Sequence, residues 1–250
     1  MCVIALFPVY WMVLSTFQPE KFSLVYPPSL LPRGFNSSAI TSLFTKQPIA
    51  AWLGHSFIAS GVTVAITLLL SVPGGYLLSR SRWHGSGVFG LLLLFTQLLP
   101  GAMVVVPELE WYRTLHWTNN LFALGVVYAA FNVPLGSWIV KSSFDSIPHE
   151  VVEACFVDGC SQFGSLRRIL LPLSRPALVA VLFVAFFAGW NDYLFASAFI
   201  TDRSLYTAGL GIWELGGNQV VAAGVIFSLP PVILYMAFQR HIARGLTVGP

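Results

Sequence analysis

Six apolar stretches, separated by polar segments, dominate this chain of 250 residues. A helix needs roughly 20 apolar residues to cross a bilayer, and the stretches reach or approach that length, the first being short. They are approximately Cys2–Thr16, Trp52–Leu78, Val88–Val106, Leu121–Val140, Ala177–Ile200 and Val220–Phe238. Only 9% of the residues are charged, against roughly 25% in a soluble domain, so lipid must be the main solvent. We expect an all-α, polytopic membrane protein with about six transmembrane helices, forming one domain over residues 1–250.

Lysines and arginines between the stretches predict the orientation, because positive charge accumulates in cytoplasmic loops. If both termini are cytoplasmic, the inside holds eight of them: Arg80, Arg82, Lys141, Arg167, Arg168, Arg175, Arg240 and Arg244. The outside then holds five, three of them in the long first loop: Lys21, Arg33, Lys46, Arg113 and Arg203. Short loops weigh more in this rule. We expect a multi-pass protein of the cell (inner) membrane with both termini in the cytoplasm.

A polar, basic segment over residues 145–172 interrupts the apolar pattern between the fourth and fifth stretches. Pro148 suits the first turn of a helix, where its missing N–H would have no partner. Glu150 and Glu153 follow in the early turns, where carboxylates suit the positive helix end. These signals predict a short cytoplasmic helix that begins close to Pro148.

The residues that follow predict a break and a second short helix. Asp158 and Gly159 end the first helix, because glycine tolerates the left-handed geometry found there, and Ser161 can cap the second. Pro172 and Pro176 would end it. The result is a glycine elbow with an apolar face drawn from Val157, Phe163, Leu166 and Leu170. Such a face suits the groove of a partner; a loop that merely packs under its own helices is an equal alternative.

Motifs that would carry chemistry are not apparent. The GxGxxG pattern over residues 85–90 follows no strand and leads into an apolar stretch, which indicates a flexible loop. No GxxxxGK[ST] phosphate loop occurs, so any ATP chemistry must lie in another subunit. The cysteines Cys2, Cys155 and Cys160 show no metal-ligand spacing and no disulfide framework, since two residues five apart splay around a helix. We expect apolar fillers, no catalytic residue, no metal and no cofactor.

The elbow segment resembles the EAA loop of permease subunits of binding-protein-dependent ABC importers. That signature reads Glu-Ala-Ala, three residues, Gly, nine residues, Ile, one residue, Leu-Pro. Its counterparts here are Glu153-Ala154-Cys155, Gly159, Ile169 and Leu171-Pro172. Cys155 replaces the second alanine, and Cys160 stands where a small alanine is common. Further along, Trp190-Asn191-Asp192-Tyr193 and Gly245-Leu246-Thr247 are similar to motifs of the carbohydrate-uptake branch.

The resemblance implies a permease subunit of an ATP-driven sugar importer. Its expected partners are a second permease, usually a different chain, a cytoplasmic ABC ATPase dimer that binds the coupling loop (about 145–172), and an extracytoplasmic sugar-binding protein. The residues carried over for ATPase coupling are Glu153, Ala154, Asp158, Gly159, Ile169 and Pro172. Basic residues form no continuous patch, so nucleic acid is not an expected partner.

Asp192 is the only acid that we place inside a span. Intramembrane charges are costly and usually face a cavity. With Trp190, Asn191 and Tyr193 it makes a candidate sugar-handling cluster, because sugars use hydrogen bonds and aromatic faces. A structural clamp between helices, or an acid near the outer interface, is an equal alternative. Asn132 could contribute to the same cavity, although a lone amide is more often a helix–helix hydrogen bond.

Two other function classes are compatible with the composition. An integral membrane enzyme, such as a transferase using Asp192 or His55, predicts convergent acid, base or nucleophile residues that the sequence does not display. A stand-alone channel or secondary carrier gives no reason for the elbow at Gly159 and would transport without ATP. The permease is the function that we expect.

Overall fold

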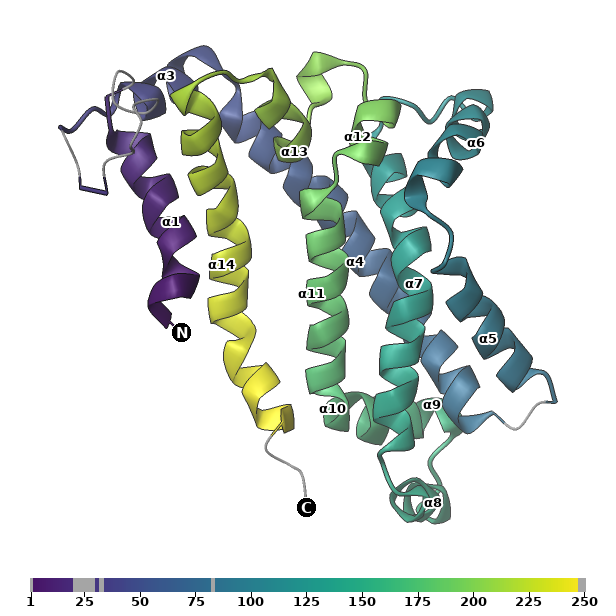
Figure 1. The fold of residues 1–250 in the computed structure, drawn as a ribbon. Helices are drawn as coiled ribbons and strands as arrows, with labels where there is room; N and C mark the ends of the chain where they lie inside the picture. Colours follow the sequence, from purple (N-terminus) through teal and green to yellow (C-terminus); the bar gives the residue numbers. More distant parts are fainter. Residues whose placement is uncertain (1, 20–29, 32–33, 82–83, 247–250) are drawn as a thin grey trace.

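The computed structural model describes residues 2–19, 30–31, 34–81 and 84–246. Every regular element within these ranges is a helix, so the all-α prediction is confirmed. Most long helices run roughly side by side (Figure 1). Short elements gather at the two ends of this bundle and differ in kind.

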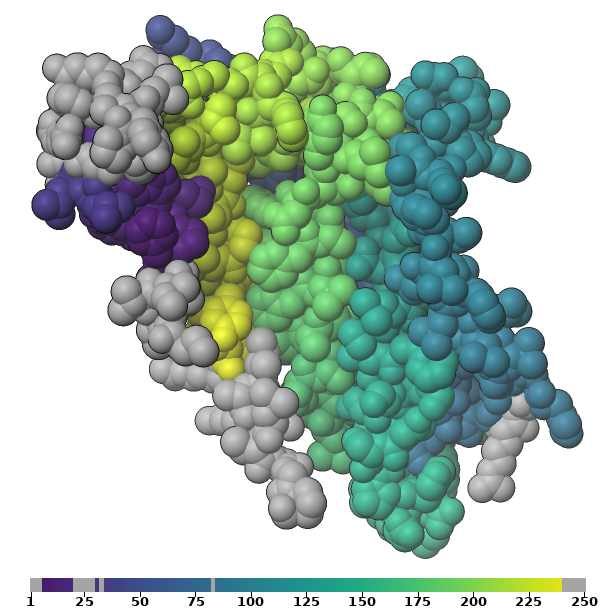
Figure 2. Space-filling model, in the orientation of Figure 1, coloured from purple at the N-terminus to yellow at the C-terminus, as the bar shows by residue number. Residues whose placement is uncertain are grey.

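One end carries three short helices, α3 (Ser38–Lys46), α12 (Leu194–Phe199) and α13 (Ala208–Gly211), and we refer to it as the α13 end (Figure 1). The opposite end, the α8 end, carries α8 (His149–Val157). In the space-filling view this helix projects at the bottom, beyond the neighbouring helices (Figure 2).

The centre of the bundle is formed by α4 (Ile49–Arg80) and α7 (Leu121–Asp145), which pack extensively against each other. A third helix, α11 (Arg175–Asn191), packs against both. All three therefore connect the α8 end with the α13 end.

Two glycines explain how closely α4 and α7 approach. A Cβ atom on Gly75 would lie 2.6 Å from Cγ1 of Val140, and one on Gly125 would lie 2.7 Å from Cβ of Val62. Lipid tails are as apolar as leucine, so association in a bilayer depends on such close van der Waals packing at small residues. Any larger side chain at either position would push the two helices apart.

Three helices in the described ranges are long and apolar enough to cross a membrane: α4, α7 and α14 (Asn218–Leu246). Two bent helix pairs raise the number to five if each pair is one span. The helix α1 (Cys2–Phe17) is apolar but shorter, and lies against α14 (Figure 2). The multi-pass architecture is supported, whereas the predicted count of six is not confirmed.

The third predicted span, Val88–Val106, is not one helix. Its residues divide between α5 (Ser86–Thr96) and α6 (Gly101–Thr114), which meet at 96°. Pro100 sits at the break in an extended conformation, and a proline supplies no N–H to continue a helix. The bend leaves α6 close to the α13 end (Figure 1).

Candidate functional site

The element at the α8 end is a bent pair of helices, as the sequence predicts. After α8 ends, Gly159 takes φ +83°, in the left-handed region that favours glycine. The next helix, α9 (Gln162–Ser165), begins after Ser161, whose Oγ accepts a hydrogen bond of 3.1 Å from the backbone N–H of Gly164. Both the glycine turn and the serine cap are present.

The second helix ends between Pro172 and Pro176, close to where the sequence predicts. It continues through a π-helical turn, η1 (Leu166–Leu170), and α10 (Leu171–Leu173), and then bends by 78° into α11. Pro172 therefore lies inside the helical run rather than ending it, since a proline is tolerated in the first turn of α10. We refer to α8 through α10, residues 149–173, as the elbow element.

One face of the elbow element is fixed to the bundle. Val152 and Leu170 are buried in an apolar cluster with three residues around the end of α7, Val140, Phe144 and Ile147. The predicted apolar face is accordingly divided: Leu170 is fully buried and Leu166 is partly buried against the same cluster. This packing sets the height and tilt of the element without any partner.

The other face of the elbow element is open. Val157 is 88% exposed and Phe163 is 72% exposed, and Val151 and Phe156 are also exposed. Of the six residues expected in coupling, Glu153, Ala154, Asp158 and Gly159 are exposed, while Ile169 and Pro172 are half-buried. Large apolar side chains gathered on a projecting element indicate a surface for interaction.

The cysteines of the elbow element correct an expectation. Cys155 and Cys160 form a disulfide, with their Cα atoms 5.3 Å apart, rather than acting as unpaired apolar fillers. On a continuous helix, two side chains five residues apart would point in different directions and could not form this bond. The chain instead reverses at Gly159, and the backbone N–H of Cys160 donates to the carbonyl of Cys155 at 2.8 Å. The glycine turn that the sequence predicts therefore also brings the two side chains together.

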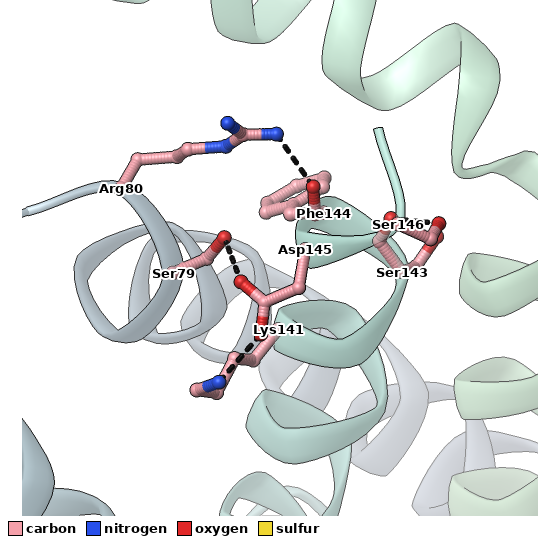
Figure 3. A network of polar contacts seen from close by, with 7 residues as sticks. All are labelled: Ser79, Arg80, Lys141, Ser143, Phe144, Asp145 and Ser146. Carbon is pink, nitrogen blue, oxygen red and sulfur yellow. Dashed lines mark hydrogen bonds and ion pairs between the residues drawn. The ribbon is translucent and has the colours of Figure 1, made fainter. Parts of the chain in front are cut away.

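A polar network joins the ends of α4 and α7 beside the elbow element (Figure 3). The Asp145 carboxylate accepts hydrogen bonds from Ser79 Oγ at 2.6 Å and from Lys141 Nζ at 2.5 Å. Ser146 Oγ donates to the carbonyl of Ser143 at 2.7 Å. The Ser79 bond fixes the last turn of α7 to α4 where the chain leaves for α8, and the other two bonds stay within the end of α7.

A cavity of about 610 Å³ lies at the α13 end, between α11, α13 and α14. Its volume falls within the range of roughly 300–1,000 Å³ that holds small molecules. Six of its lining residues are aromatic: Phe187, Trp190, Tyr193, Trp213, Phe227 and Tyr235. We call it the aromatic cavity, and it has the composition of a site for the apolar faces of a small ligand.

Three residues of the predicted sugar cluster line the aromatic cavity, namely Trp190, Asn191 and Tyr193. Trp190 is buried and donates its indole N–H to the carbonyl of Phe227 at 3.0 Å, so its ring is fixed. Tyr193 packs against Trp213 with ring centroids 4.9 Å apart. The Asn191 amide is exposed and has no hydrogen-bond partner among the described side chains and backbone. It is free to bind a ligand.

The remaining two residues of that cluster lie elsewhere. One oxygen of Asp192 accepts hydrogen bonds from Tyr128 Oη at 2.8 Å and from the backbone N–H groups of Phe195 and Ala196, each at 3.0 Å. Asn132 donates to the carbonyl of Tyr128 at 2.7 Å, within α7. Asp192 therefore caps α12, which explains why the fifth predicted stretch does not continue as one helix beyond Asn191.

The rim of the aromatic cavity is held by an ion pair at the α13 end. Arg203, in η2 (Arg203–Leu205), pairs with Glu214, in η3 (Ile212–Glu214). The hydrogen bond and charge of Glu214 hold the pKa of the Arg203 guanidinium above its usual value. Glu214 follows Trp213 directly, which places that ring at the rim.

Sequence reasoning missed the cavity's second wall. Residues of α14 line it at helical spacing, with Phe227 and Ser228 followed by Pro231 and Tyr235. The positions i, i+1, i+4 and i+8 share one helix face, so the stripe was visible in the sequence. No neighbouring residue in the sequence indicates whether this stripe faces a cavity or lipid.

The chain matches the sequence pattern of the family described as "Binding-protein-dependent transport system inner membrane component" over residues 48–248. It belongs to this family. Two curated relatives of this inner membrane component are each 30% identical to it. The Inner membrane ABC transporter permease protein YcjP of Escherichia coli (strain K12) matches over 99% of this chain and 91% of that protein. The Trehalose/maltose transport system permease protein MalG of Thermococcus litoralis matches over 100% and 92%.

Among solved structures, this inner membrane component is similar to one chain of a bacterial ABC transporter involved in the import of the acidic polysaccharide alginate. The TM-score is 0.81 over 96% of this chain and 91% of that chain, at 23% sequence identity. The likeness shows the fold. The bent helices and the projecting elbow element are therefore compatible with a permease architecture.

Proposed function

We propose that this chain is the permease subunit of an ATP-driven sugar importer, forming part of the translocation pathway while a separate cytoplasmic ATPase dimer hydrolyses ATP. The observation that carries the proposal is the division of the molecule. A face with exposed apolar side chains lies at one end and an aromatic cavity at the other, within a chain that belongs to a transport family. The chain contains no phosphate loop of its own.

The elbow element is the proposed ATPase contact. Val157 and Phe163 would enter an apolar groove of the ATPase, in the helix-in-groove mode of recognition. Glu153, Asp158 and Gly159 are exposed beside them and available to the same partner. Under this proposal the α8 end and both termini would lie in the cytoplasm, and the lysine and arginine distribution supports that orientation.

The aromatic cavity is the proposed sugar contact. The Tyr193 and Trp213 rings at its rim offer faces for the C–H surface of a sugar, and the free Asn191 amide offers both a donor and an acceptor. The relative named for trehalose and maltose supports sugars as the substrate class. A secreted binding protein would deliver the sugar to this end, and a second, different permease would complete the pathway.

The test is co-purification followed by reconstitution. A tag on this chain should retain a second permease and an ATPase from native membranes, identified by mass spectrometry. Proteoliposomes containing the whole complex should take up labelled maltose or trehalose only with ATP and the binding protein. If this chain alone moves solute without a nucleotide-hydrolysing partner, the proposal is wrong.

A further inference from the structure

One arginine links three elements at the α8 end. Arg80, the last residue of α4, donates from Nη2 to the backbone carbonyl of Phe144 at 2.6 Å (Figure 3). Arg80 donates from the same Nη2 to the backbone carbonyl of Ile147 at 2.7 Å. Its Nη1 lies 2.8 Å from Nδ1 of His149. A guanidinium is only a donor, so His149 accepts with its neutral Nδ1. The side chain thus spans the end of α7 and the first residue of α8.

The chemistry of this contact favours an arginine. The last carbonyls of a helix have no partner within the helix, and the negative end of its dipole favours a cation. Phe144 and Ile147 are buried, so their carbonyls favour a strong donor; the Phe144 carbonyl also accepts from the backbone N–H of Ile147 at 3.2 Å. A planar guanidinium can bind several acceptors in fixed directions, whereas a lysine ammonium acts as a point charge. Arg80 therefore fixes orientation as well as distance.

The opposite end of α4 is fixed to the wall of the aromatic cavity. Ser56 Oγ accepts a hydrogen bond of 2.8 Å from the backbone N–H of Ala208, a cavity-lining residue in α13. His55 Nδ1 bonds the carbonyl of Tyr206 at 2.9 Å. The Trp52 ring lies so close to Gly211 that a Cβ there would be 2.4 Å away. These contacts make α13 move with α4.

The helix between these two anchors is long. From Ser56 to Arg80 it spans roughly 36 Å at 1.5 Å per residue. Packed interfaces switch between discrete arrangements rather than deforming continuously, so a helix held at both ends can carry a displacement along its length. A displacement of the elbow element would reach the cavity wall through α4 only if the elbow element holds its end.

We propose that Arg80 is the positioning residue that transmits movement of the elbow element through α4 to the aromatic cavity. The inference rests on the proposed function, because the movement originates in the ATPase. Arg80 itself contacts neither sugar nor nucleotide in this arrangement. Its substitution should leave the parts assembled but reduce the dependence of the cavity on nucleotide.

The experiment measures that dependence directly in the complete transporter, reconstituted in proteoliposomes. Ser228 lines the aromatic cavity and is exposed, so Ser228→Cys serves as a near-isosteric reporter after the native cysteines of this chain are replaced. Its reaction rate with a membrane-impermeant maleimide is measured without nucleotide and with ATP plus vanadate. With Arg80 present, nucleotide should change the rate. With Arg80→Ala, that change should fall roughly tenfold, the scale of a typical coupling energy.

A matched control lies beside Arg80. Lys141 contributes a positive charge at the same end, but its ion pair with Asp145 stays within α7. Lys141→Ala should preserve the nucleotide response. Arg80→Lys keeps the positive charge but loses the planar guanidinium, and it should give an intermediate nucleotide response. If Arg80→Ala fails to accumulate, the response of Arg80→Lys tests the positioning role in its place.

Two results would overturn the positioning role: an unchanged nucleotide response in the Arg80 variants, or loss of the ATPase from their purified complexes, which would assign Arg80 to docking. Failure of the proposed function has a different signature. In that case the parent protein with Arg80 intact would itself retain no ATPase or show no nucleotide response.

Discussion

The elbow element and the Trp190–Tyr193 motif both rest on a few adjacent residues, yet they relate to the fold in opposite ways. In the elbow, Gly159 and Ser161 act on their own backbone, through a left-handed turn and a helix cap. In the motif, neighbouring side chains enter two environments: Asn191 lines the aromatic cavity, whereas Asp192 caps α12. Turns and caps that depend on local backbone chemistry can therefore be predicted from sequence. Whether a side chain enters a cavity or caps a helix depends on helices that are distant in the sequence.

The largest expected effect is that of Gly159→Asp. A Cβ at this position meets no atom within 4 Å, and aspartate is one of the residues that tolerates a left-handed conformation. The variant should therefore reach the membrane. A charged side chain at the centre of the proposed docking face should uncouple the permease from its ATPase and lower sugar uptake at least roughly tenfold.

The measurement pairs uptake with ATPase co-purification, and Gly159→Asn is the matched control because it has the same shape without the charge. A stronger defect for aspartate than for asparagine assigns the effect to charge, and equal defects assign it to bulk. Wild-type uptake with normal co-purification in Gly159→Asp would show that the elbow element does not dock the ATPase. The elbow element and the Trp190–Tyr193 motif would then no longer differ in function.

The second effect concerns the structural half of the motif. Asp192→Ala leaves the Tyr128 hydroxyl and two N–H groups of α12 without their acceptor. Loss of a cap and of a buried acceptor should lower stability by about 2 kcal/mol. We expect a reduced thermal midpoint in detergent and altered uptake, with assembly retained.

Tyr128→Phe sharpens this prediction, because it removes only one of the three bonds. In a double-mutant cycle, Tyr128→Phe should add little to Asp192→Ala if the two act as one unit. Additive losses would show that they act separately. Wild-type stability together with a raised KM in Asp192→Ala would instead assign Asp192 to the sugar.

These two regions also explain what the sequence could predict. Helical class, spans around α4 and α7, the elbow and the Ser161 cap all follow from local signals. The pairing of Cys155 with Cys160 was within reach, because the same glycine turn that ends α8 brings them together. A continuous helix would keep the two cysteines apart, and only the turn at Gly159 brings them together.

Other features depend on tertiary structure and had no local signal. The Arg80 contacts join residues 64 to 69 positions apart. Phe227 and Tyr235 contribute to the cavity only because α14 packs beside α11. Apolar residues facing lipid and apolar residues facing a cavity look alike in sequence, since both surroundings exclude charge.

A third, smaller effect tests the cavity half of the motif. Trp213 is 69% exposed, so Trp213→Ala should leave stability nearly unchanged. Loss of its ring beside Tyr193 should raise the KM for sugar uptake roughly fivefold, the scale of one aromatic contact. Trp111 in α6 is similarly exposed, at 71%, and Trp111→Ala is the control that should keep the normal KM. An equal rise in KM for Trp213→Ala and Trp111→Ala would show that the aromatic cavity has no specific role in sugar binding.

The smallest effect is expected from the disulfide of the elbow element. Loop closure over so few residues contributes about 2 kcal/mol at most, and under the proposed orientation the pair faces the reducing cytoplasm, where disulfides are rare. The turn is set by Gly159 and by the backbone bond between Cys160 and Cys155. Replacing both cysteines with alanine should therefore change uptake less than Gly159→Asp does.

Reduction of the native protein with dithiothreitol should have an equally small effect, and the double alanine variant under the same reductant controls for any other target. A native complex that loses uptake on reduction, while the alanine variant keeps it, would mean that free thiols disturb the docking face. Loss of uptake in the alanine variant itself would mean that the cross-link, and not the glycine, holds the elbow. The backbone geometry argues for the glycine, because its left-handed conformation is what places the two sulfurs within bonding distance.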